Sequence, residues 1–209
     1  MGAPFITFEG IEGSGKSTQV RLLSDHLASR NIPHAVTREP GGTPLAESVR
    51  ALLLSHRDGE IIFPETELLL YEAARAQHVR IVVRPALDAG KAVLCDRFCD
   101  ATLAYQGHAR RLPAAWIEEL NAYAAGGLVP DLTVLLDLSP EEGFARLAAR
   151  GGGRDRLEGE SLKFHRLVRE GYLLLQARHP GRIVRVDGAP PPDRVFSEVR
   201  EAVASRFGW

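Results

Sequence analysis

A glycine-rich segment near the N-terminus carries the clearest chemistry in the sequence. Residues 8–18 read FEGIEGSGKST, in which Gly10 is followed, after four residues, by Gly-Lys-Ser. Between a strand and a helix, such a loop points successive backbone N–H groups at a phosphate. Lys16 would then contact the β- and γ-phosphates, and Ser17 would offer its hydroxyl to Mg²⁺. The expected ATP-binding residues are Gly10, Ile11, Glu12, Gly13, Ser14, Gly15, Lys16, Ser17 and Thr18.

The variable positions of this loop are informative because none of them is an arginine. Positive charge for a transferred phosphoryl group must therefore come from another segment. Glu12 is unusual beside phosphates, since its carboxylate would repel them unless it faces Mg²⁺, a water molecule or a sugar hydroxyl. A solvated loop position is the alternative interpretation of Glu12.

Charged residues also close two further predicted strands. Arg38 is the second residue of the segment TREPGGT (residues 37–43) and closes the predicted strand 34–38. The pair Asp96-Arg97 lies at the end of the predicted strand 92–96. The carboxyl ends of strands are where open α/β sheets bind ligands, so a guanidinium there suits capture of a phosphate. Asp96 could hold the hydration shell of Mg²⁺ while Arg97 reaches an anionic oxygen.

Two segments offer groups that could recognise a base. Tyr71 and Arg75 are spaced i, i+4 in the predicted helix ELLLYEAARAQHV, so their side chains share one face. The stretch TLAYQ adds the hydroxyl of Thr102, the ring of Tyr105 and the amide of Gln106 just beyond Asp96-Arg97. A core position is the alternative for Tyr71.

Four arginines lie around three consecutive glycines at residues 151–153. Arg146 is interpreted as a favourable charge near a helix C-terminus. Arg150, Arg154 and Arg156 lie beside a glycine hinge, which predicts a lid at about residues 148–160 that closes over polyphosphate. This lid would supply the arginine that the phosphate loop lacks.

Strands and helices are predicted to alternate along the chain. Apolar, β-prone runs predict strands at residues 5–9, 34–38, 92–96, 132–137 and 182–186. Helical periodicity predicts helices at residues 17–30, 44–54, 66–89 (disturbed at Pro85), 113–125, 140–150, 159–178 and 192–206. We therefore expect one α/β domain over residues 1–209, in three layers, with a five-stranded parallel sheet and helices on both faces.

Composition excludes several classes of protein. The chain has 209 residues, 44% of them hydrophobic, with 26 Lys and Arg against 27 Asp and Glu. No overall field favours a nucleic-acid polymer or an anionic membrane. Neither a membrane span nor a signal peptide is expected, and Cys95 and Cys99 lack zinc-site spacing, so free thiols and a cytoplasmic location are predicted.

At this point the chain resembles the bacterial thymidylate kinase family. The motifs FEGIEGSGKST, TREPGGT, ELLLYEAARAQHV, DRFCDATLAYQG and a lid stretch ending in DRLE occur in order and at fitting spacing from residue 5 to about residue 170. The resemblance implies a nucleoside monophosphate kinase fold, a homodimer, Mg²⁺, and transfer of the γ-phosphoryl group of ATP to dTMP, which yields dTDP and ADP.

The resemblance also implies roles for individual residues. Those matched to the acceptor dTMP are Glu12, Arg38, Tyr71, Arg75, Arg97, Thr102, Tyr105 and Gln106. Ser17 and Asp96 are the expected Mg²⁺ residues, the latter through water. The candidate catalytic residues are Lys16, Arg97, Arg150, Arg154 and Glu12, with Arg150 and Arg154 as alternatives for the γ-phosphate.

Two departures from the family pattern keep other activities open. Ala101 replaces a usual serine, and Tyr71 a common phenylalanine. A kinase for another nucleotide or deoxynucleoside is one alternative. A nucleotide-dependent switch or ATPase is another, although the sequence has no guanine-specifying Asn-Lys-x-Asp stretch.

Overall fold

Five parallel strands form the central sheet among the residues that the structure describes, which are 2–55, 60–151, 153 and 155–209 of a computed structural model. They are β1 (Phe5–Glu9), β2 (His34–Arg38), β3 (Ala92–Asp96), β4 (Leu132–Asp137) and β5 (Ile183–Asp187), in the order β2-β3-β1-β4-β5. The predicted parallel sheet is confirmed, with β5 one residue later than expected. Because β1 is central, its carboxyl end meets segments from both halves of the sheet.

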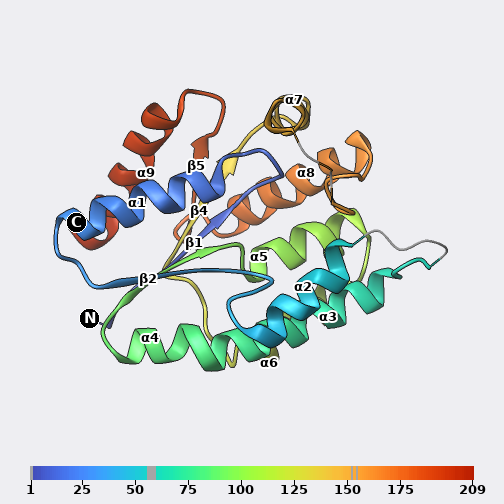
Figure 1. The fold of residues 1–209 in the computed structure, drawn as a ribbon, viewed down its shortest axis with the longest axis horizontal. Coiled ribbons are helices and arrows are strands. Elements are labelled where there is room, and N and C mark those ends of the chain that lie inside the picture. The colour runs from blue at the N-terminus through green and yellow to red at the C-terminus, as the bar shows by residue number, and fades with distance from the viewer. Residues whose placement is uncertain (1, 56–59, 152, 154) are drawn as a thin grey trace.

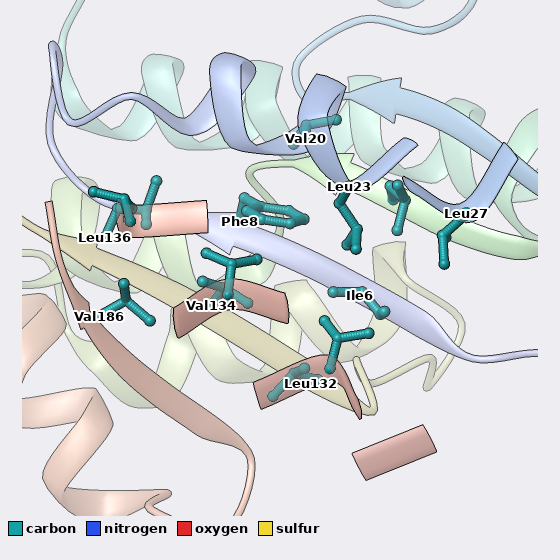
Figure 2. Packing of buried hydrophobic residues seen from close by; sticks show 13 residues of the cluster. Ile6, Phe8, Val20, Leu23, Leu27, Leu132, Val134, Leu136 and Val186 are labelled. Atoms are coloured by element: carbon teal, nitrogen blue, oxygen red, sulfur yellow. The ribbon is translucent and has the colours of Figure 1, made fainter. Parts of the chain in front are cut away.

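Helices cover both faces of the sheet, as Figure 1 shows. The helices α1 (Lys16–Ser29) and α9 (Pro192–Phe207) pack on one face. Alternate residues of the central strands point to that face, where Ile6 and Phe8 join Leu23 of α1 in the largest apolar cluster (Figure 2). The three predicted layers are therefore present.

The other elements complete the second face and the rim. They are α2 (Pro44–Leu54), α3 (Pro64–His78), η1 (Val79–Val83), α4 (Arg84–Asp88), α5 (Cys99–Thr102), η2 (Leu103–Ala109), α6 (Ala114–Ala124), α7 (Pro140–Arg150) and α8 (Leu162–Arg178). Within the described residues, no helix is both long and apolar enough to cross a membrane.

The long helix expected at residues 66–89 consists of α3, η1 and α4 end to end. Its middle segment η1 has π-helical turns and ends at Val83, two residues before Pro85. Proline has no N–H to donate to the preceding turn, so the hydrogen-bond register widens there. The predicted disturbance at Pro85 is thus a π segment in a helix that continues.

The sequence did not predict α5 and η2, the helical stretch after Asp96-Arg97. It packs closely against α8, because Gly171 of α8 lets the two backbones approach: a Cβ atom there would lie 2.9 Å from His108 Cβ and 3.1 Å from Ala104 Cα. Helix α8 itself begins at Leu162 rather than at Gly159, since Ser161 caps it by accepting a hydrogen bond from Phe164 N.

Candidate active site

The phosphate loop connects β1 to α1 and is closed by the Lys16 side chain. Gly10 and Gly13 have φ angles of 139° and 75°, and a Cβ atom on either would lie 2.5 Å from a carbonyl oxygen of another segment. The Lys16 Nζ atom donates to the carbonyls of Gly10 (3.0 Å) and Ile11 (2.8 Å). Burial, followed by the charge of Arg97, lowers the pKa of Lys16 to about 8. The lysine is therefore a desolvated cation held inside the loop.

Ser17 and Asp96 meet where α1 begins and β3 ends. The Ser17 hydroxyl donates to Asp96 Oδ2 across 2.6 Å. Both predicted Mg²⁺ residues are thus brought together at the floor of the phosphate loop.

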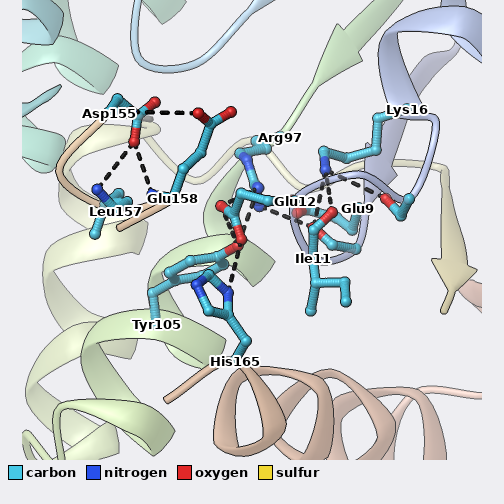
Figure 3. A network of polar contacts seen from close by, with 12 residues as sticks. Glu9, Ile11, Glu12, Lys16, Arg97, Tyr105, Asp155, Leu157, Glu158 and His165 are labelled. Carbon is cyan, nitrogen blue, oxygen red and sulfur yellow. Dashed lines mark hydrogen bonds and ion pairs between the residues drawn. The ribbon is translucent and has the colours of Figure 1, made fainter. Parts of the chain in front are cut away.

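Arg97 lies at the centre of a polar network, shown in part in Figure 3. Its Nη1 atom donates to Gly10 O and to the Tyr172 hydroxyl, both at 3.0 Å. Its Nη2 atom donates to Glu12 Oε1 (2.9 Å) and to the Tyr105 hydroxyl (3.0 Å). We call Arg97 and these four partners the Arg97 network. It joins the phosphate loop to η2 and α8.

Glu12 is ionised within this network. Burial favours its neutral form, but Arg97, His165 and Lys16 together hold the pKa of the carboxyl well below its usual range. The Tyr105 hydroxyl donates to Glu12 Oε1 across 2.6 Å. A solvated loop position, the alternative interpretation of Glu12, is therefore wrong.

Arg75 is 2% exposed and lines a cavity together with Lys16 and Arg97. Its Nε atom donates to Glu39 (2.8 Å), Nη1 to Glu72 (2.7 Å) and Asn121 (2.5 Å), and Nη2 to Thr102 (2.9 Å). A guanidinium fixed by four partners presents its remaining N–H in one direction, which suits recognition of a single carbonyl.

The other predicted acceptor residues line the cavity as well. Arg38 lies at its rim, where Nη2 donates to both carboxylate oxygens of Glu47 (3.0 and 2.9 Å). Tyr71 also lines the cavity, and burial raises the pKa of its hydroxyl. Gln106 donates to Glu67 across 2.8 Å.

One cavity of about 520 Å³ is lined by both sets of residues. Its lining includes Lys16 and Ser17 next to the phosphate loop, Arg38 and Arg75, and also Arg97, which donates to the loop residue Gly10. A volume of this size fits small molecules, and the arrangement can hold two anions in one enclosure.

Comparison with known proteins decides the family. The thymidylate kinase family model matches residues 8–199. The thymidylate kinase of Geobacter sp. (strain M21) is 52% identical over 208 residues, which are 97% of this chain and 92% of that protein. The thymidylate kinase of Syntrophotalea carbinolica is 53% identical over 200 residues, covering 93% and 92%. The crystal structure of thymidylate kinase from Ehrlichia chaffeensis has a TM-score of 0.76 at 33% identity and covers 97% of this chain and 100% of that chain.

The chain belongs to the thymidylate kinase family. The resemblance noted in the sequence, the nucleoside monophosphate kinase fold and the activity of a dTMP kinase are thereby confirmed.

The two described lid arginines, Arg150 and Arg156, point in different directions. Arg150 donates to Glu158 across 2.8 Å and lines the cavity. Arg156 instead faces α2 and α3, where it donates to Leu53 O (2.7 Å) and Glu67 Oε2 (2.5 Å). Arg154 lies outside the described residues. The expectation that Arg156 adds charge at the phosphate loop therefore does not fit its position.

Arg146, interpreted from the sequence as a dipole charge only, lies beside the phosphate loop. Its guanidinium donates to Gly13 O (3.4 Å) and to Ala189 O (2.9 Å), and it lines the cavity. The sequence did indicate this position, because Arg146 lies four residues before Arg150 on α7 and residues four apart share a helix face.

Sequence reasoning missed several side chains that build the site. Tyr172 donates to Glu9 Oε2 across 2.7 Å while it accepts from Arg97. Burial, followed by the charge of Asp100, raises the pKa of Glu9 to about 7. His165 and Tyr172 are spaced i, i+7 on α8, so they share its inner face, but that spacing is equally typical of an ordinary core stripe.

Proposed function

We propose that ATP binds on the phosphate loop and dTMP in the compartment around Arg75, and that the γ-phosphoryl group passes between them to give dTDP and ADP. The observation that supports this assignment is the Arg97 network, which joins the phosphate loop to η2 and α8 in a cavity that Arg75 also lines. The whole chain, residues 1–209, would act as one catalytic domain with its lid at about 148–160.

On the donor side, backbone N–H groups of residues 10–18 would cradle the β- and γ-phosphates. Lys16 would leave its carbonyl partners for the phosphate oxygens. Arg150 or Arg154 would approach the γ-phosphate as the lid closes, and the closed lid would exclude the water that otherwise hydrolyses ATP.

On the acceptor side, Arg38 would bind the phosphate of dTMP and Tyr71 would stack on thymine. Arg75, Thr102 and Gln106 would hydrogen-bond the base. The fixed Arg75 guanidinium supports this role, because a rigid donor discriminates a carbonyl from an amino group. Glu12 and Tyr105 would lie beside the deoxyribose.

No general base is required for this reaction. A phosphate monoester has a second pKa of about 6, so dTMP is already dianionic at neutral pH. The obstacle is the repulsion between two polyanions, which Lys16, Arg38 and Arg97 would offset while they align the reacting groups.

Mg²⁺ would bind next to Ser17 and Asp96. A hydroxyl and a carboxylate are the oxygen ligands that Mg²⁺ prefers, and their contact of 2.6 Å brings both to one point. The part of the chain that the structure describes contains no group of three or more His, Cys, Asp or Glu side chains that could hold a metal. Phosphate oxygens and water would therefore complete the shell, and the ion would neutralise charge on the β- and γ-phosphates.

A homodimer in the cytoplasm is part of the proposal. Large apolar side chains are exposed on the neighbouring helices α2, α3 and α6, namely Leu45, Leu52, Leu69, Trp116 and Tyr123. Such surfaces are typical of protein interfaces, and a second copy of the chain presents the same surface.

A coupled ADP-release assay with Mg²⁺, ATP and one of dTMP, dUMP, dCMP, dGMP or AMP tests the proposal. We expect the highest kcat/KM with dTMP and little ADP without an acceptor. Preference for a purine monophosphate, or ADP release that is independent of any acceptor, would refute it.

A further inference from the structure

His165 is a buried side chain that the proposed roles leave unused. It lies in the first turns of α8, four residues after the capping Ser161, and is 1% exposed. Its ring packs edge-on against Phe144 and Phe164, with centroids 5.0 and 5.5 Å apart. These contacts hold the imidazole in one place.

The Nδ1 atom of His165 lies 3.0 Å from Oε2 of Glu12 (Figure 3). The two groups are at hydrogen-bonding distance but imperfectly aligned, since among the described residues neither His165 nitrogen nor Glu12 Oε2 has a partner of good geometry. Hydrogen bonds at catalytic sites are often poorly aligned before substrate binds and tighten in the complex.

The other Glu12 oxygen already has two donors. Arg97 Nη2 and the Tyr105 hydroxyl both donate to Oε1, at 2.9 and 2.6 Å. Two donors fix the position of Oε1, but the plane of the carboxylate can still rotate about that atom. A third donor on Oε2 fixes the plane.

We propose that His165 is a positioning residue that donates its Nδ1–H to Glu12 Oε2 and so sets the orientation of the carboxylate toward the acceptor sugar. This inference rests on the proposed placement of dTMP beside Glu12. Because α8 begins directly after the lid, the turn that ends the lid also orients Glu12.

Two substitutions separate the hydrogen bond from the packing. His165→Phe keeps a ring between Phe144 and Phe164 but removes the donor, whereas His165→Asn returns an N–H close to the position of Nδ1. His108→Phe is the matched control, because His108 faces Glu170 across 3.4 Å away from the cavity lining.

We expect His165→Phe to lower kcat/KM for dTMP about tenfold, mainly through KM for dTMP, as befits one lost hydrogen bond to a charged group. The KM for ATP should change by less than about twofold. His165→Asn should recover most of the loss, and His108→Phe should match the wild type.

The proposal is overturned if His165→Phe behaves as the wild type, if the Asn and Phe variants are impaired equally, or if KM rises equally for both substrates. If a variant does not fold, imidazole ¹⁵N NMR of the wild type saturated with dTMP decides: a proton on Nδ1 supports the bond, and a neutral ring protonated only on Nε2 contradicts it. Absence of dTMP-dependent turnover in the wild type would instead contradict the proposed function.

Discussion

Lys16 is a buried cation, and the carbonyls of Gly10 and Ile11 and the Ser14 hydroxyl accept hydrogen bonds from its ammonium group. Replacing it with methionine, which keeps much of the stem volume, removes the charge that phosphates would meet. We expect Lys16→Met to lower kcat about 10³-fold or more with the fold intact. Turnover with dTMP and circular dichroism check this, with the exposed Lys91→Met as control. Turnover near that of the wild type in a folded variant would refute the role.

The lowered pKa of Lys16, about 8, makes nucleotide binding depend on pH. Bound phosphates are negative and raise the pKa of Lys16 again. At about pH 9 the neutral lysine therefore takes up a proton when nucleotide binds, whereas at about pH 7 it is already charged. ATP affinity should therefore fall as pH rises above 8. Calorimetry in two buffers with different ionisation enthalpies measures the proton uptake, which Lys16→Met should abolish. Equal uptake in both proteins would contradict the assignment.

Sequence alone predicted the residues that belong to local motifs. The order strand, glycine-rich loop, helix predicts the loop glycines, Lys16 and Ser17, and the end of a further predicted strand marks the pair Asp96-Arg97. Tyr172 and Asn121 could not be predicted in this way. Their partners Arg97 and Arg75 are distant in the chain, and only packing brings them together.

At the scale of elements, Glu67 ties three segments together. It is 0% exposed in α3 and accepts from Gln106 and Arg110 of the η2 region and from Arg156 at the end of the lid. Its two arginine partners have side chains that are 18% exposed. Removing the Glu67 carboxylate takes away the carboxylate that Arg156 pairs with and leaves Arg110 with Glu160.

We therefore expect Glu67→Ala to lower the free energy of unfolding by about 3–5 kcal/mol. The control is Glu118→Ala, whose exposed pair with Arg178 should contribute less than about 1 kcal/mol. Urea unfolding measures both. Similar losses in the two variants would show that the Glu67 cluster adds no more than a surface pair.

Element prediction succeeded where periodicity is long and failed where packing decides. The five strands and the helices α1, α2, α7 and α9 follow from apolar runs and start signals. The helical stretch α5–η2 contains few periodic residues, and its contact with α8 at Gly171 depends on a helix some sixty residues later. The fold class was thus predictable, whereas the helix carrying Tyr105 was not.

At the scale of the whole molecule, the exposed apolar side chains of α2, α3 and α6 predict self-association. Leu69 on α3 is 58% exposed, and Leu174 on α8 is 55% exposed and lies outside this group. We expect the wild type to be a dimer by light scattering, Leu69→Glu to shift it toward the monomer, and Leu174→Glu to leave it dimeric. A monomeric wild type would refute the interface, and so would a dimer that Leu69→Glu leaves intact.

The close contact at Gly171 should also limit which residues evolution accepts at this position. The backbones of α8 and η2 touch at this glycine, and the next residue, Tyr172, shares Arg97 with Tyr105 of η2. A single added methyl group would wedge the two helices apart and separate the two hydroxyls that hold the guanidinium. Selection on turnover should therefore tolerate only glycine at a position that touches neither nucleotide.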